Sequence, residues 1–148
     1  KLLKDAKQDG VTLYVISAYR AMSKQISLYD AEVARQKSAH PEYSDEQAKA
    51  AAGKNVAIPG TSEHQLGLAI DFTVPGILHD DFHLTEQSTW LKNNAWKYGF
   101  VRTYTESDEE ITGQKASDTH YRYVGQELAR MIHDSGSTFA KYAMIAMK

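Results

Sequence analysis

Apolar residues recur at helical spacing in several stretches of the chain. Between residues 22 and 33 they follow one another at intervals of four, three and four: Met22, Ile26, Tyr29 and Val33. This period predicts an amphipathic helix over residues 23–36. Comparable patterns predict further helices at 1–9, 85–98, 126–134 and 137–148. The run from Ser44 to Gln47 has the form of a capping box and predicts a short helix that Gly53 ends.

Other stretches are short and rich in β-branched and aromatic residues, which is typical of strands. Residues 11–17 predict a buried strand, and three more runs predict strands at 67–73, 100–104 and 119–124. Residues 54–61 and 74–83 are expected to be loops. Helices and short strands are mixed without regular βαβ alternation, which indicates an α+β fold. The chain has 148 residues and neither repeats nor a linker, so we expect a single domain over 1–148.

Charge and composition narrow the possible partners. The formal net charge of -2 gives no electrostatic reason to expect nucleic acid or an anionic membrane as partner. No apolar run is long enough to cross a bilayer. Cysteine is absent, so any metal must be held by imidazole and carboxylate groups. The sequence starts at Lys1 without a visible signal peptide, so we expect an N-terminal segment or anchor to be missing from it, and we expect a monomer.

Two histidines and one aspartate stand out by their local context. His64 precedes an apolar run, and Asp71 lies near the far end of that run, where a carboxylate is costly to bury unless it is paired or bound to metal. Both can reach one ion only if His64 lies on a turn before the strand, and Gly67 offers that break. His120 opens another predicted strand. Two imidazoles and a carboxylate are the ligand set of a hydrolytic zinc site.

Simpler roles remain open for the same residues. A histidine near a strand end is usually an ordinary polar residue, and Asp71 could instead pair with Arg20 or Arg122. The remaining histidines occupy polar loops or a helix face, where surface roles are expected: His40, His79, His83 and His133. Four aromatic residues are assigned to the core: Tyr19, Trp90, Trp96 and Phe100.

Several motifs occur in the order found in one enzyme family. They are Ser17-Ala-Tyr-Arg20, Ser62-Glu-His-Gln-Leu-Gly-Leu-Ala-Ile-Asp71, Tyr98-Gly-Phe100, Ile111-Thr-Gly113 and His120-Tyr-Arg-Tyr-Val-Gly125. The chain resembles the VanY-like D-alanyl-D-alanine carboxypeptidases, in a wider group with lysostaphin-type enzymes, D-Ala-D-Ala dipeptidases and the hedgehog signalling domain. The resemblance covers about residues 1–130. It implies a central antiparallel sheet flanked by helices, one Zn²⁺ ion, and bacterial enzymes that are secreted or face the cell wall.

The resemblance also implies roles for individual residues. His64, Asp71 and His120 correspond to the zinc ligands. Arg20 corresponds to the cation that faces the substrate and stabilises the developing oxyanion; its alternative is a structural ion pair. Two further residues match positions that touch the peptide: Gln25 and Ser62. Ser62 could instead cap a turn, because it forms a capping-box pattern with Gln65.

One position departs from the family pattern. The family places a glutamate, the general base, three residues before the last zinc histidine, and Ser117 stands there in this chain. Asp118 is the nearest carboxylate and is our predicted base. Because one residue in an extended segment is a change of face, Asp118 reaches the reacting water only if the chain bulges there.

These observations predict a zinc carboxypeptidase that removes a terminal D-alanine from peptidoglycan stem peptides, by D,D or L,D cleavage. We expect it outside the cell or facing the wall, either free or anchored through the missing segment. Two alternatives stay open. One is a degenerate zinc-containing module that binds wall peptides without hydrolysis, which Ser117 motivates. The other is an endopeptidase that cuts cross-links on the same scaffold.

Overall fold

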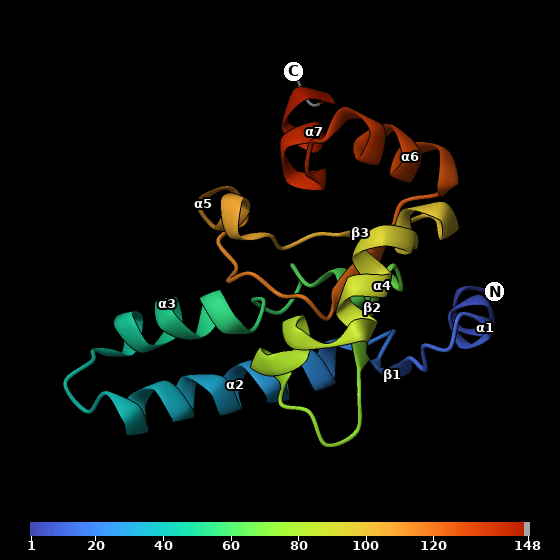
Figure 1. The fold of residues 1–148 in the computed structure, drawn as a ribbon. Helices are drawn as coiled ribbons and strands as arrows, with labels where there is room; N and C mark the ends of the chain where they lie inside the picture. The colour runs from blue at the N-terminus through green and yellow to red at the C-terminus, as the bar shows by residue number, and fades with distance from the viewer. Residues whose placement is uncertain (147–148) are drawn as a thin grey trace.

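Four short strands form one antiparallel sheet in the computed structural model, which describes residues 1–146 (Figure 1). The strand order is β1-β2-β4-β3, and the bounds are Tyr14–Ser17 for β1, Ala69–Thr73 for β2, Phe100–Arg102 for β3 and His120–Tyr123 for β4. Asp71 on β2 lies directly opposite His120 on β4 and next to Ser17 on β1. The α+β class and the antiparallel sheet expected from the sequence are confirmed.

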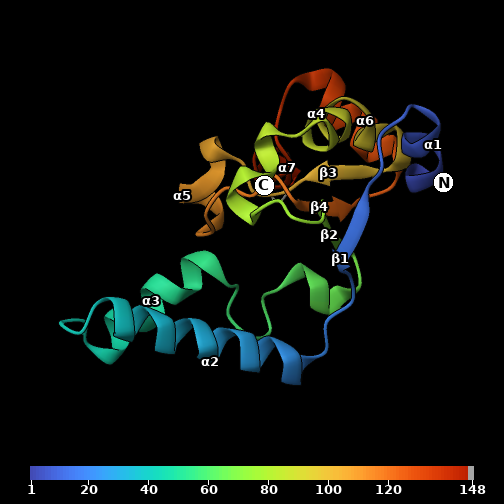
Figure 2. The same ribbon diagram turned by 60° about the horizontal axis from the view of Figure 1, so that its bottom comes forward.

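Helices lie on both sides of this sheet. In Figure 2 the hairpin of α2 and α3 lies below the strands, and α1, α4 and α6 lie above them. The helix bounds are α1 Leu2–Gln8, α2 Met22–Ala39, α3 Asp45–Asn55, α4 Glu86–Asn94, α5 Glu109–Thr112, α6 Gln126–Ser135 and α7 Phe139–Ala146. Four short 3₁₀ helices join them: η1 Glu63–Leu66, η2 His79–Leu84, η3 Ala95–Tyr98 and η4 Glu106–Asp108.

Two groups of buried side chains hold these elements together. The larger core joins α1, the strands, η2 and α4, with Phe72 and Tyr121 in edge-to-face contact at its centre. Burial of such rings contributes about 1.5–3 kcal/mol each. The smaller group packs α6 on β3 through Val101, Ala129 and Ile132.

Local sequence signals predicted several boundaries well. Ser44 accepts a hydrogen bond from the Gln47 backbone N–H, and the Gln47 side chain accepts one from the Ser44 backbone N–H, so the capping box is confirmed. The helix predicted over 85–98 is divided into α4 and η3. The helix predicted over 137–148 is α7, and residues 147–148 of that prediction lie outside the described part of the chain.

Other predictions were wrong. The strand predicted over 11–17 begins only at Tyr14, and β1 is largely exposed because it is an edge strand paired with β2 alone. The apolar face predicted for α2 is partly exposed. The residues of this helix that are buried are Gln25 and Gln36. The reason is that α2 packs mainly on α3 rather than on the core. Tyr19, assigned to the core, is 70% exposed.

Among residues 1–146, no helix combines the length and the apolar character that crossing a membrane requires.

Candidate metal centre

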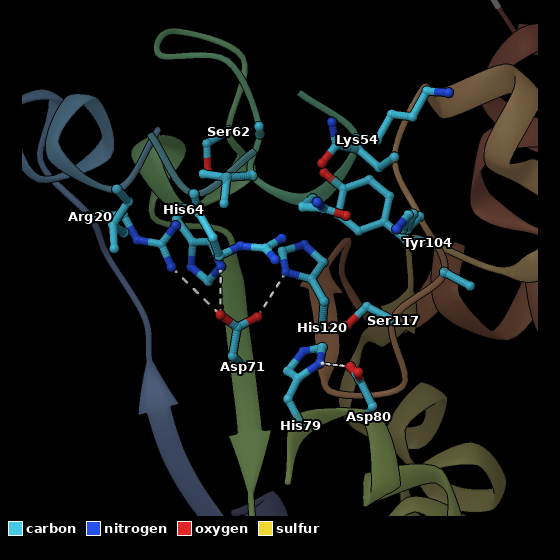
Figure 3. A pocket seen from close by; sticks show the side chains of 18 residues that line it. Arg20, Lys54, Ser62, His64, Asp71, His79, Asp80, Tyr104, Ser117 and His120 are labelled. Atoms are coloured by element: carbon cyan, nitrogen blue, oxygen red, sulfur yellow. Dashed lines mark hydrogen bonds and ion pairs between the residues drawn. The ribbon is translucent and has the colours of Figure 1, made fainter. Parts of the chain in front are cut away.

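His64, Asp71 and His120 converge beside strands β2 and β4 (Figure 3). Each offers one ligand atom, and these atoms all lie within 4.8 Å of one another. Asp71 is central: its Oδ2 lies 3.0 Å from His64 Nε2, and its Oδ1 lies 2.9 Å from His120 Nδ1. Both histidines are buried, at 3% and 6% exposure. The sequence predicted this grouping, and the fold brings all three side chains together.

Local structure explains how His64 reaches the sheet. It lies on η1, which ends at Gly67 with a φ of 69°. A left-handed residue is favourable only for glycine, so Gly67 turns the chain sharply before β2 starts at Ala69. Asp71 and His120 face each other across the β2–β4 ladder. The turn before the strand that the seven-residue spacing required is therefore present.

The second nitrogen of each imidazole fixes which atom is free for a metal. His64 Nδ1 lies 2.7 Å from the carbonyl oxygen of Ala18, and a carbonyl can only accept, so Nδ1 carries the proton. His120 Nε2 donates in the same way to the carboxylate of Glu63 at 2.9 Å. The remaining nitrogens, His64 Nε2 and His120 Nδ1, carry lone pairs that face the Asp71 carboxylate. A cation between these electron-rich atoms suits the arrangement, and the donor set fits Zn²⁺.

The electrostatics keep the carboxylate ionised. Without a metal, burial raises the pKa of Asp71, but protons that His120 and His64 then donate to the carboxylate outweigh it and hold this pKa well below its ordinary range. Burial lowers the pKa of His120, whereas Asp71 and Glu63 raise it, with a net increase. Burial also raises the pKa of Tyr104, so this side chain stays a neutral phenol at pH 7. The Tyr104 ring stacks on His120 with centroids 4.7 Å apart.

Arg20 approaches the same carboxylate from β1. Its Nη2 lies 3.6 Å from Asp71 Oδ2 and donates to Ser17 Oγ at 2.9 Å, while Nη1 donates to Gln25 Oε1 at 2.9 Å. Gln25 was predicted to touch the peptide, but its side chain is completely buried and its Nε2 donates to the Ala57 carbonyl at 2.6 Å. Gln25 therefore holds Arg20 and does not line the cavity. The fork of the guanidinium is set before any ligand arrives.

Ser62 lines the cavity beside His64, as its predicted contact with a peptide requires. The alternative capping box is not formed, because the Ser62 side chain makes no capping bond and Gln65 Oε1 accepts from the Gly60 backbone N–H at 2.8 Å. Gln65 is therefore engaged by Gly60, whereas the Ser62 hydroxyl is free to contact a ligand.

Asp118, the predicted base, is not brought to the metal centre. Its Oδ1 lies 2.7 Å from Lys92 Nζ and 3.2 Å from Arg102 Nη1, and it is not among the residues that line the cavity. Ser117 lines the cavity in its place and contacts Thr119, whose hydroxyl lies 2.9 Å from His79 Nε2. The chain bends at Asp118 and Thr119 just before β4, but the Asp118 side chain is held by Lys92 and Arg102 and does not reach the metal centre.

Three residues of the site were missed from the sequence. Glu63 contacts His120, Tyr104 covers its ring, and His79, assigned to a polar loop, lines the cavity. Glu63 alone carried a signal, because it directly precedes a candidate ligand, and carboxylates commonly surround metal histidines. His79 and Tyr104 lie about 40 and 16 positions from His120, so no local pattern connects them.

The cavity is open and polar, with a volume of about 690 Å³. The metal centre forms its floor, and the α2–α3 hairpin forms one wall. Cationic side chains on its sides include Lys54 and Lys115. This volume lies within the usual range for small-ligand sites and is large enough for the end of a peptide.

Comparisons with known proteins place the chain in a family of carboxypeptidases, as the metal centre would suggest. Residues 1–126 match the family model VanY, D-alanyl-D-alanine carboxypeptidase. A D-alanyl-D-alanine carboxypeptidase of Enterococcus faecalis (strain ATCC 700802 / V583) is 43% identical over 143 residues, which cover 95% of this chain and 51% of that protein. The chain thus spans about half the length of this curated relative.

Two solved structures extend the comparison. VanYB in complex with D-alanine-D-alanine superposes with a TM-score of 0.85 at 43% identity, covering 96% of this chain and 76% of the other. A glutamate-to-alanine mutant of the vancomycin resistance D,D-pentapeptidase VanY, in complex with Zn(II), gives a TM-score of 0.83 at 44% identity and covers 96% and 77%. That relative holds Zn(II) although one of its glutamates is replaced.

Proposed function

Because the chain belongs to the VanY family of D-alanyl-D-alanine carboxypeptidases, we propose that it is a zinc carboxypeptidase acting on peptidoglycan stem peptides, from which it removes a terminal D-alanine. The observation that carries the proposal is the convergence of His64, Asp71 and His120 with both free imidazole nitrogens turned inward. We further propose that it acts as a monomer outside the cytoplasmic membrane, where peptidoglycan lies.

Each residue of the centre has a chemical task in this proposal. Bound zinc would supply a Lewis acid for the scissile carbonyl and lower the pKa of a water molecule. Arg20, held by Ser17 and Gln25, receives an oxygen of the substrate through its planar pair of donors and opposes the negative charge that develops there. Ser62 offers its hydroxyl to the peptide backbone.

Charge at the mouth of the cavity suits the same substrate. A stem peptide ends in a carboxylate, and Arg20, Lys54 and Lys115 line the cavity. Attraction between the peptide and these cations favours entry of the carboxylate end first. Removal of the last residue, rather than cleavage within a chain, follows from that orientation.

Proton transfer is the step for which the chain has no placed carboxylate. Ser117 stands where the family has its glutamate, and a hydroxyl does not accept a proton at neutral pH. Asp118 would have to leave Lys92 and Arg102 to take this role. This observation favours a second candidate function: a zinc-bearing module that binds the same peptides without cleaving them.

One assay with two variants separates the candidates. The zinc-loaded protein is incubated with a pentapeptide ending in D-Ala-D-Ala and with the matching tetrapeptide, and mass spectrometry detects the loss of one alanine. If Asp118 is the base, Asp118→Asn lowers kcat by about 10²–10⁴-fold and keeps zinc, whereas Ser117→Glu brings no gain. If the chain is a binding module, the unaltered protein leaves both peptides intact, and Ser117→Glu is the variant that gains turnover.

A further inference from the structure

We propose that Glu63 is a positioning residue that sets the orientation of His120 toward the metal and ties the two histidine ligands together. The inference rests on the zinc site proposed above and goes beyond its three ligands. Glu63 opens η1 directly before His64 and is 8% exposed. It belongs to neither the ligand set nor the residues that line the cavity.

Three side-chain donors contact the Glu63 carboxylate. Its Oε2 accepts from His120 Nε2 and from Thr103 Oγ1, both at 2.9 Å, and its Oε1 accepts from Arg122 Nη1 at 2.7 Å. Thr103 directly follows β3, and the other two donors lie on β4. The carboxylate contacts Nε2 of His120, on the opposite side of the ring from the Nδ1 that faces Asp71, and the hydrogen bonds from His120 and Arg122 lower its pKa despite burial. It therefore does not replace the glutamate that is absent at Ser117.

The contact with His120 has a direct effect on a ligand. A carboxylate that accepts the N–H of a metal-bound imidazole fixes the tautomer and the plane of the ring and makes its other nitrogen more basic. His64 has a weaker partner in the same position, the neutral carbonyl of Ala18. The two histidines are thus supported unequally, and the charged support goes to His120. Rotation of that ring would break the 2.9 Å contact and turn Nδ1 away from Asp71.

Glu63 also couples two elements that carry ligands. Its backbone is part of η1, which bears His64, and its side chain accepts hydrogen bonds from His120 and Arg122 on β4. The spacing of the two imidazoles, whose centroids lie 5.0 Å apart, is thereby fixed by one short side chain. Arg122 balances the charge of Glu63 and itself lies over the Phe139 ring at 4.9 Å.

Zinc affinity separates a positioning role from a purely structural ion pair. The unaltered protein and Glu63→Gln are stripped of metal and titrated with Zn(II) against a chelating indicator. Glutamine keeps the size of the side chain but loses its charge, so we expect the Kd for zinc to rise about 10–100-fold. The Co(II)-loaded proteins give a second readout, since the visible absorption bands shift when the imidazole donor weakens.

Controls distinguish this effect from a loss of folding. Glu106→Gln removes a carboxylate that pairs with Arg102 at 2.7 Å, remote from the ligands, and should leave the zinc Kd unchanged. If Glu63→Gln alone is unstable because Arg122 is left unpaired, the double variant with Arg122→Gln removes both charges and should show the same weakened binding.

Two results would overturn the inference in distinguishable ways. A folded Glu63→Gln protein whose zinc Kd stays within about threefold of the unaltered value refutes the positioning role and leaves the zinc site standing. An unaltered protein that binds no zinc refutes the site itself, and the role of Glu63 with it.

Discussion

Replacement of Arg20 by lysine keeps the positive charge beside Asp71 and removes the planar fork. Arg20 donates through Nη1 to Gln25 and through Nη2 to Ser17, both at 2.9 Å. A lysine ammonium group can satisfy one of these acceptors but not both while it points at the cavity. The variant therefore tests whether the geometry of this cation matters, rather than its charge.

The structure allows the two expected effects to be compared. Loss of one hydrogen bond from a charged donor costs about 1.5–3 kcal/mol of unfolding free energy, which lowers Tm by roughly 3–12 °C in a domain of this size. Loss of a donor aimed at developing charge lowers kcat/KM by about 10²–10³-fold. A domain with about 5–15 kcal/mol of stability remains folded after the first loss, so the second dominates at 25 °C.

The assay measures kcat and KM on the D-Ala-D-Ala-terminated peptide and Tm on the same preparations, with Arg130→Lys on the exposed face of α6 as the matched control. We expect the control to leave both quantities unchanged. If Arg20 serves only as a structural ion-pair residue, Arg20→Lys lowers Tm while kcat of the folded protein holds steady. That outcome would remove Arg20 from the reaction. If the unaltered protein has no turnover, Kd for the peptide replaces kcat/KM as the readout.

Two more predictions concern the metal and the hairpin. His64→Ala and His120→Ala should each lose the zinc that elemental analysis finds in the unaltered protein, and full occupancy in either variant would contradict the ligand assignment. Glu32 on α2 joins α3 by accepting from Asn55 and also accepts from Arg35 on its own helix. The hydrogen bond with Arg35 is the main cause that lowers the pKa of Glu32 from 4.5 to about 2. Its contribution to stability is therefore complete above pH 4.5 and is lost as the pH falls through about 2. Thermal unfolding should show Glu32→Gln less stable at pH 7, with the difference shrinking as the pH falls from about 4.5 towards 2.

Local sequence signals predicted individual helices. They did not predict features that depend on contacts between distant parts of the chain. The Ser44 capping box lies within four residues, so the sequence alone located the start of α3. The exposure of β1 could not be predicted, because it depends on which strand pairs with it. The 3₁₀ helices carry no long period, so η1, η2 and η4 were missed, and η3 was predicted only as the end of a longer helix.

In the site too, local features were predicted and contacts between distant segments were not. Gly67 and the spacing between His64 and Asp71 required a turn, and the turn is present. That His120 faces Asp71 across the sheet is a matter of register between strands 49 positions apart, which no periodicity specifies. Local context offered these three residues as a candidate ligand set, and the resemblance to a family assigned them together. The diversion of Asp118 to Lys92 could not be foreseen either, since both partners lie in other elements.

The sheet and the cavity walls make separate contributions to the centre. Asp71 and His120 are opposed through the backbone ladder of β2 and β4, whereas the walls come from the α2–α3 hairpin and from the loops that hold His79 and Ser117. A change of length in the hairpin leaves the ladder untouched, so the scaffold can exchange one peptide for another without rebuilding its ligand set. Sequence differences between relatives that change peptide preference should therefore lie mostly in the hairpin. A hairpin grafted from a relative should transfer that relative's peptide preference and leave the metal centre of this chain intact.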